Sequence, residues 1–235
     1  MNARKKKLNW RAWLVPAGLI LLSLVPALAG TSRLIELSSG AEITEANARF
    51  FASPLPVVLH IISVTLYSII GAFQFSTPLR HWRPRWHRLA GWFLVPGGLV
   101  AALSGLWMTQ FYPWPAGDGV FLYWQRIFFG SAMLLAILLG VLAIRQRNYR
   151  QHGAWMIRAY AIGLGAGTQV FTHIPWFLVG GASAPPELPR ALMMGAGWVI
   201  NLLVAEWVIR KRPTRRQRSS SATLSKPASK QEQLL

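Results

Sequence analysis

Six long apolar blocks separated by shorter polar segments form the dominant pattern of this chain. A transmembrane helix needs roughly 20 apolar residues to cross the hydrocarbon core of a bilayer, and each block approaches or exceeds that length. The pattern therefore predicts an all-α fold, a polytopic transmembrane helical bundle of about six spans. The blocks cover about residues 13–29, 54–75, 89–108, 120–144, 153–179 and 191–209.

The same pattern divides the chain into five segments. We expect a basic cytoplasmic N-terminus at 1–12, a first span at 13–29, an external loop at 30–53, a five-span bundle at 54–210 and a basic cytoplasmic tail at 211–235. The tail is rich in Arg, Lys, Ser and Gln, a composition typical of disorder.

The first block has a second interpretation, as a signal peptide. Ala27-Leu28-Ala29 before Gly30 resembles a signal-peptidase site that follows a basic region, and cleavage there would leave five spans. The apolar stretch of about 17 residues is longer than most signal-peptide cores and favours an uncleaved signal anchor.

Basic residues predict the orientation, because Lys and Arg are retained on the cytoplasmic side during insertion. Of the 25 Lys and Arg residues, 21 fall on one side if both termini and the loops after the second and fourth blocks share that side. The other side receives five of the seven acids and the remaining four basic residues, Arg33, Arg49, Arg126 and Arg190. We therefore expect a multi-pass protein of a bacterial cytoplasmic (inner) membrane with both termini in the cytoplasm.

The net charge of +18 suggests an acidic partner. Because the basic residues lie between and beyond the apolar blocks, anionic lipid headgroups are the expected partner and nucleic acid is not. With no cysteine in the chain, a disulfide, an iron–sulfur cluster and a covalently attached haem are excluded. Any metal or haem would need histidine or oxygen ligands.

Polar side chains inside the apolar blocks are costly and mark candidate sites. They fall into two layers, one near each membrane face. The outer layer consists of His60, Arg126 and His173. The inner layer consists of Gln74, His87, His152, Arg158, Asn201 and Glu206.

Two histidines in each layer allow a haem hypothesis, because imidazoles from two helices can ligate haem iron from both sides. The pairs would be His60 with His173 and His87 with His152, with Arg158 bound to a haem propionate or a quinone oxygen. His152 and His173 are 21 residues apart (173 − 152), about 31 Å along a helix, which would push both haems to the membrane surfaces. One haem b is therefore favoured over two.

Structural roles explain the same residues equally well. His60 and His173 can hydrogen-bond between helices, and His87 and His152 can face headgroups. Arg158 and Glu206 would form an ion pair if the fifth and sixth spans are neighbours, because neither charge would persist unpaired in a span. The closely spaced glycines Gly163, Gly165 and Gly167 favour close helix packing.

Several stretches between residues 47 and 210 together resemble a family of bacterial predicted membrane proteins, the domain-of-unknown-function family 2306 (DUF2306). The resemblance implies that His60, both inner histidines and the other inner polar residues occupy characteristic positions of the family. Thr172-His173 stands where the family often has an arginine, which weakens the outer haem pair. The stretches are Asn47-Ala-Arg-Phe50 with Pro54 and Leu59-His60, Gly71-Ala-Phe-Gln-Phe75, His87-Arg88-Leu-Ala-Gly91, His152 with Trp155-Met-Ile-Arg158-Ala-Tyr160-Ala161, and Asn201-Leu-Leu-Val-Ala-Glu206-Trp207.

Three function hypotheses follow, with enzymatic activity left undecided. The first is a membrane redox component that binds haem b or a quinone at the intramembrane histidines. The second is a carrier or transporter of a small solute or protons through the polar cluster. The third is a non-catalytic membrane assembly or scaffold protein whose basic tail contacts lipid or a partner.

Overall fold

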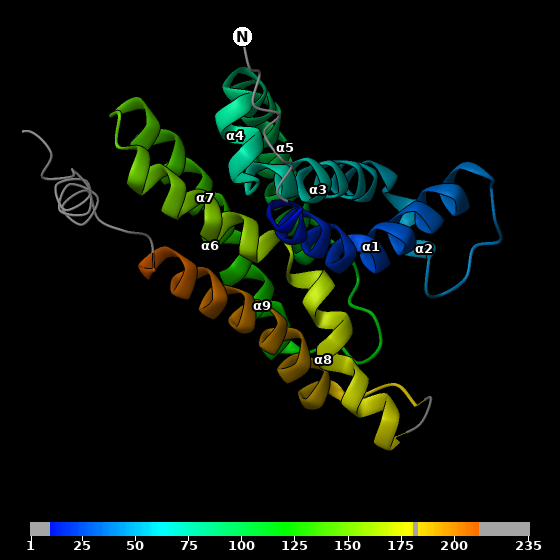
Figure 1. The fold of residues 1–235 in the computed structure, drawn as a ribbon. Coiled ribbons are helices and arrows are strands. Elements are labelled where there is room, and N and C mark those ends of the chain that lie inside the picture. Colours follow the sequence, from blue (N-terminus) through cyan, green and yellow to red (C-terminus); the bar gives the residue numbers. More distant parts are fainter. Residues whose placement is uncertain (1–9, 181–182, 212–235) are drawn as a thin grey trace, which may run out of the picture.

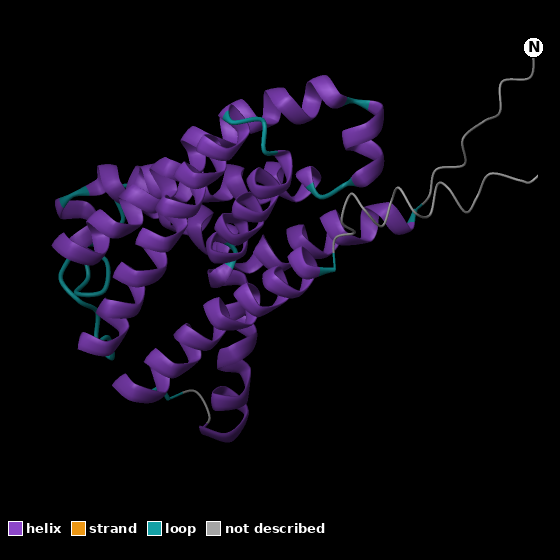
Figure 2. Ribbon diagram, turned by 90° about the vertical axis from the view of Figure 1, so that its left-hand side faces the viewer, coloured by secondary structure: helices purple, strands orange, loops and turns teal. Residues whose placement is uncertain are grey.

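The computed structural model describes residues 10–180 and 183–211. Within these residues the chain consists of helices and connecting loops without a β-strand, which confirms the predicted all-α class (Figures 1 and 2). The helices are α1 (Arg11–Ser38), α2 (Ala48–Ala52), α3 (Pro54–Gln74), α4 (Thr77–Trp82), α5 (Pro84–Phe111), α6 (Val120–Arg145), α7 (Tyr149–Gly163), α8 (Gly165–Gly180) and α9 (Glu187–Arg210).

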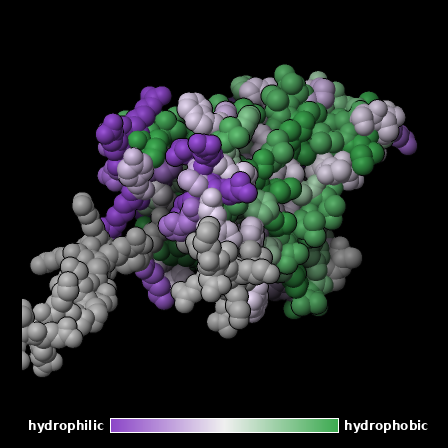
Figure 3. Space-filling view, turned by 45° about the horizontal axis from the view of Figure 1, so that its top comes forward, coloured by the Kyte–Doolittle hydropathy of each residue, from purple (hydrophilic) through white to green (hydrophobic). Residues whose placement is uncertain are grey.

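Five helices in the described part of the chain are long and apolar enough to cross a membrane, namely α1, α3, α5, α6 and α9. Large apolar side chains cover their outer faces, and Trp92, for example, is 80% exposed. Figure 3 shows hydrophobic residues over much of the visible surface, with hydrophilic residues gathered toward one side. An apolar exterior of this extent is typical of a protein whose solvent is lipid.

The fifth predicted span is not one continuous helix. It forms α7 and α8, which meet at a bend at Leu164 (Figure 1). Glycines flank this residue and are weak helix formers, and close packing also favours the bend. The indole of Trp198 lies where a side chain on Gly165 would project, and the backbone of Leu22 lies against Gly167. The expectation that these glycines serve helix packing is confirmed.

Three helix boundaries differ from the sequence expectation. Helix α1 continues to Ser38, into the stretch predicted as an external loop, and the short helix α2 occupies the end of that stretch. Helix α5 begins at Pro84, because proline suits the first turn of a helix, and His87 therefore lies in its first turn. The basic N-terminus at 1–9 and the tail beyond residue 211 lie outside the described residues.

The loops predicted to be external meet at one end of the bundle. Arg49 Nη1 donates a hydrogen bond to the Pro113 carbonyl at 3.2 Å, and Arg190 Nε donates to Asp118 Oδ1 at 2.7 Å. We call this end, formed by the loops at 39–47, 112–119 and 183–186, the Asp118 end. The opposite end, formed by α4 and the turn at 146–148, is the His152 end (Figure 1).

Small and aromatic residues build the core between these ends. Tyr67 and Tyr160 are buried with ring centroids 5.7 Å apart. The Tyr160 hydroxyl donates to the Ser68 carbonyl at 2.7 Å, which satisfies a polar group that would otherwise be costly in a bilayer. Gly71 of α3 and Gly98 of α5 give these rings their space. Helices α3, α5 and α7 are thereby held close together.

Gly167→Ala should destabilise the fold by about 1–2 kcal/mol, since a Cβ there would collide with the main chain of Leu22 and force α1 and α8 apart. The midpoint of thermal unfolding in detergent measures this. Gly97→Ala is the matched control, because nothing lies within 4 Å of its Cβ position and alanine is the better helix former. Equal midpoints for the two variants would refute the packing role of Gly167.

Candidate functional site

A cavity of about 440 Å³ lies in the half of the bundle next to the Asp118 end. Its walls come from α1, α3, α5, α6, the α7–α8 bend and α9, and its lining residues are mostly apolar or aromatic. At the Asp118 end it is lined by Arg49, Tyr112 and Asp118, and deeper in the bundle by Met133, Gly163 and Leu164. It therefore combines a polar mouth with an apolar interior.

His60 of α3 lines this cavity. Its Nδ1 lies 2.9 Å from the Ala101 carbonyl and 3.2 Å from Ser104 Oγ. A carbonyl oxygen only accepts, so Nδ1 carries a proton, and in the neutral ring Nε2 is left with its lone pair. His60 therefore bonds α3 to α5 and keeps a second nitrogen able to accept a hydrogen bond.

Asp118 organises the mouth of the cavity. Its side chain is only 2% exposed, and it accepts from Arg126 Nη1 at 2.5 Å and from Arg190 Nε at 2.7 Å. These two arginines belong to α6 and α9, so one carboxylate joins the loop before α6 to two helices. Each oxygen of the Asp118 carboxylate thus accepts a hydrogen bond from one arginine.

Arg49 lies beside Asp118 without reaching it. Its Nη1 donates to the Pro113 carbonyl, and its Nε is buried without a hydrogen-bond partner. The carbon of its guanidinium lies 4.6 Å from the centroid of the Phe50 ring. Burial lowers the pKa of Arg49 from its ordinary value, although arginine keeps its proton in proteins. The mouth thus holds a cation that lacks a carboxylate partner.

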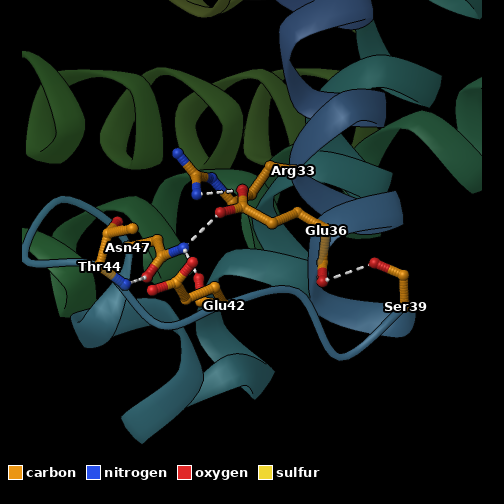
Figure 4. Close-up of polar contacts among 6 residues, drawn as sticks. All are labelled: Arg33, Glu36, Ser39, Glu42, Thr44 and Asn47. Carbon is orange, nitrogen blue, oxygen red and sulfur yellow. Dashed lines mark hydrogen bonds and ion pairs between the residues drawn. The ribbon is translucent and has the colours of Figure 1, made fainter.

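A hydrogen-bonded clamp joins the end of α1 to Asn47, the residue before α2 (Figure 4). The carboxylate of Glu36 accepts from Arg33 and from Asn47 Nδ2, the latter at 2.5 Å. Asn47 Nδ2 also donates to the Glu42 carbonyl at 3.0 Å, and its Oδ1 accepts from the Thr44 amide at 2.7 Å. Asn47 is 3% exposed, so the end of α1 and the start of α2 are joined by a buried amide.

Aromatic contacts fix the same region from the other side. Phe50 packs edge-to-face on Tyr112 with centroids 5.5 Å apart, and the Tyr112 hydroxyl donates to the Ser53 carbonyl at 2.5 Å. Burial raises the pKa of Tyr112, which keeps its hydroxyl a donor. Arg33 lies 4.6 Å from the Phe50 centroid, as Arg49 does. The guanidinium of Arg49 is therefore held by an aromatic pair and by a backbone carbonyl.

The structure separates the predicted outer residues. His60 and Arg126 line the cavity, whereas His173 is not among its lining residues. His173 Nδ1 lies 2.7 Å from the Gln169 carbonyl one turn earlier in α8. A haem bound between His60 and His173 would need both imidazoles to face one space, so the geometry does not support this pair.

The predicted inner residues lie toward the His152 end, and the expected ion pair among them is confirmed. Arg158 donates to both oxygens of Glu206, from Nε at 2.5 Å and from Nη2 at 3.1 Å. This bidentate contact occupies the arginine proposed for a propionate or quinone oxygen. Asn201 instead donates to the Ala161 carbonyl at 3.0 Å and accepts from Thr168 at 2.6 Å.

The inner histidines differ in their hydrogen bonding. His152 Nδ1 lies 2.9 Å from the Gly140 carbonyl of α6. His87 Nδ1 and Gln74 Nε2 are buried without a hydrogen-bond partner. Among the described residues, the only hydrogen bonds within the six-residue inner cluster are those of the Arg158–Glu206 pair, and no group of three or more His, Asp or Glu side chains is placed to hold a metal ion. Apart from the Arg158–Glu206 pair, the described residues of the inner cluster are not hydrogen-bonded to one another.

Sequence reasoning missed the residues that build the mouth. Asp118 lies in the segment at 112–119, which is rich in the turn residues Pro and Gly, and the signal in the sequence is an acid eight residues before Arg126. Arg49 entered only the charge count and the Asn47–Phe50 stretch. Nothing local in the sequence shows that these residues lie close together, because α2 and the loop at 112–119 are more than 60 residues apart.

The sequence profile of a family described as predicted membrane proteins, DUF2306, matches residues 57–209, which is more than half of the chain. The chain belongs to this family. The part that matches DUF2306 runs from α3 into α9 and includes His60, Asp118 and Arg126, whereas α1 and Arg49 precede it. No curated protein and no solved structure matches the chain. Family membership therefore supports a membrane protein and leaves its ligand to be inferred from the cavity.

Proposed function

We propose that this protein is a membrane carrier or binding protein that takes up an amphipathic small molecule in the cavity next to the Asp118 end. The chain would cross a bacterial cytoplasmic membrane six times, with α7 and α8 together forming one crossing. Both termini would be cytoplasmic, because basic residues concentrate on the side that includes the His152 end. The Asp118 end would then face outward.

One observation carries the proposal: the cavity joins a charged mouth to an apolar interior. Binding sites for small molecules are mostly apolar, with a few polar groups that fix orientation. Here the charged groups gather at one end, next to loops 39–47 and 112–119, while the interior is lined by residues such as Phe129 and Met133. A ligand with a polar head and an apolar body complements this distribution.

The bend at Leu164 supports a carrier. Carriers often bind their substrate where a transmembrane helix is interrupted near the middle of the bilayer. Ile162, Gly163 and Leu164 lie at this interruption and line the cavity. Helix α1 contributes Ser23, Pro26 and Gly30 to the wall of the cavity, which supports its retention as a span. A shift of α8 about the bend would change the shape of the cavity.

Labelling with a photoreactive C12 alcohol tests the proposal. We expect saturable labelling of cavity residues in the purified protein in nanodiscs, with the modified residues located by mass spectrometry. Ala166→Trp should reduce labelling at least fivefold, because Ala166 lines the cavity and an indole there would fill it. Leu178→Trp is the matched control on the same helix, since Leu178 is 79% exposed and outside the cavity. Non-saturable labelling spread over lipid-facing residues would refute the proposal.

A quinone is a second candidate ligand, favoured by His60. The free Nε2 of this residue can accept a hydrogen bond from a quinol hydroxyl inside an apolar wall. Extraction of the purified protein should then release bound quinone, and His60→Ala should reduce the amount severalfold.

An absorbance spectrum of the same preparation, oxidised and reduced, tests the haem hypothesis independently. The scaffold hypothesis rests on the tail at 211–235, which lies almost wholly outside the described residues.

A further inference from the structure

The charged residues that line the cavity do not balance. They are Arg49, Asp118 and Arg126, which gives a net charge of +1 (two cations and one anion). Asp118 is already shared between Arg126 and Arg190, a residue outside the lining. Asp118, Arg126 and Arg190 together therefore keep a net charge of +1 (two cations and one anion). Arg49 adds a second positive charge that no carboxylate in the described part of the chain pairs with, because Asp118 already binds the other two arginines.

Arg49 has unused hydrogen-bonding capacity on a fixed side chain. Of its donors, Nη1 contacts a backbone carbonyl, and Nε is buried without a partner. A buried donor without a partner is costly, and more so on a charged group. The Phe50 ring packs against the guanidinium, and the Pro113 carbonyl accepts a hydrogen bond from it. An anion at the mouth would meet the Nη donors of a guanidinium that already lines the cavity.

We infer that the ligand of this cavity is an anionic amphiphile, with a carboxylate or phosphate head bound by Arg49 and its apolar chain inside the bundle. The planar guanidinium matches the two oxygens of such a head. The Arg49 donors lie at the mouth, and the apolar lining extends from there toward Leu164. This inference rests on the proposed function, since it assigns the class of molecule that the cavity binds.

Arg33 provides a matched control for Arg49. Both guanidiniums lie 4.6 Å from the centroid of the same phenyl ring. Arg33, however, is paired with Glu36 and does not line the cavity. Replacing either arginine by glutamine removes one positive charge and one guanidinium from the Phe50 ring. Arg33→Gln leaves the Asn47–Glu36 hydrogen bond in place, so a direct contact with the ligand head is lost only in Arg49→Gln.

The test compares photoreactive probes that share one C12 chain and differ in the head: alcohol, carboxylate and phosphate. The full-length protein is reconstituted in nanodiscs of zwitterionic lipid, and half-saturating concentrations are measured at cavity residues. For wild type we expect the better anionic probe to saturate at a concentration about ten- to hundredfold lower than the alcohol, the range given by hydrogen bonds to a charged group. A lower half-saturating concentration for the carboxylate probe than for the phosphate probe would indicate a fatty-acid-like ligand. The reverse order would indicate a ligand with a phosphate head.

Arg49→Gln should abolish the preference for the anionic probe, and Arg33→Gln should preserve it within about twofold. If Arg49→Gln does not yield monodisperse protein, Arg49→Lys replaces it and should reduce the preference at least threefold, because lysine lacks the planar fork. Equal half-saturating concentrations for the alcohol and the anionic probes in wild type would overturn this inference while leaving the cavity proposal intact. An undiminished preference for the anionic probe in the Arg49 variant would have the same meaning. Absence of saturable labelling by every probe would refute the cavity proposal itself.

Discussion

Asp118→Asn should cost about 3 kcal/mol of stability, the largest effect of any substitution proposed for this protein. The carboxylate is almost fully buried and accepts from Arg126 and Arg190. Removing one partner of a buried ion pair is strongly destabilising, because the other charge remains without compensation. Here a single substitution leaves two guanidiniums unpaired, and Asp118 also lies close enough to the positive charge of Arg49 to interact with it.

Thermal unfolding in detergent measures this effect, with an expected fall in the midpoint of roughly 6–12 °C at about 2–4 °C per kcal/mol. Glu45→Gln is the control, since it removes the same charge from an exposed position in a loop at the same end. Adding Arg190→Gln to Asp118→Asn should recover part of the loss, because one uncompensated cation disappears. A double variant less stable than Asp118→Asn alone would show that the carboxylate does not serve to neutralise these arginines.

Glu206→Gln should cost about 2–3 kcal/mol, the second largest effect. Glu206 accepts both hydrogen bonds of a bidentate contact from Arg158, and this contact joins α9 to α7. The expected value lies at the lower end of the cost of a single charge within a span, because both side chains are partly exposed.

A double-mutant cycle separates the pair from its surroundings. Arg158→Gln, Glu206→Gln and the double variant are compared by their unfolding midpoints in detergent. The double variant should be more stable than the sum of the single losses predicts, by about 1 kcal/mol or more. Strict additivity would mean that the two side chains do not stabilise each other. Arg158 also lies 4.6 Å from the Trp155 ring centroid, a contact that the Glu206 variant leaves in place.

The fold class was predictable because span length and hydropathy are local properties of the chain. Five of the six apolar blocks correspond to long apolar helices. The fifth block forms two helices, and the glycines at its bend pack against Trp198 and Leu22, which come from other helices and which no local pattern predicts. The continuation of α1 to Ser38 also escaped prediction, since polar residues such as Glu36 there bind partners from a later loop.

The site was less predictable than the fold. An intramembrane charge demands a partner, and that rule found the Arg158–Glu206 pair correctly. It gave no position for the cavity, because a cavity is the space left by several packed helices and no single segment encodes it. His60 and Arg126 were identified as unusual, but their association with Arg49 and Asp118 arises only when the loops at 39–47 and 112–119 meet.

The contact between Gly167 and Leu22 has a consequence for biogenesis. These residues are 145 positions apart (167 − 22), and they belong to neighbouring helices that both line the cavity. The ribosome must therefore synthesise most of the chain before α1 can contact α8. Until α8 is inserted, the cavity lacks the part of its wall that Ala166, Gly167 and Gln169 supply. Lipid chains would occupy that space first, and the arrival of α8 would have to expel or enclose them.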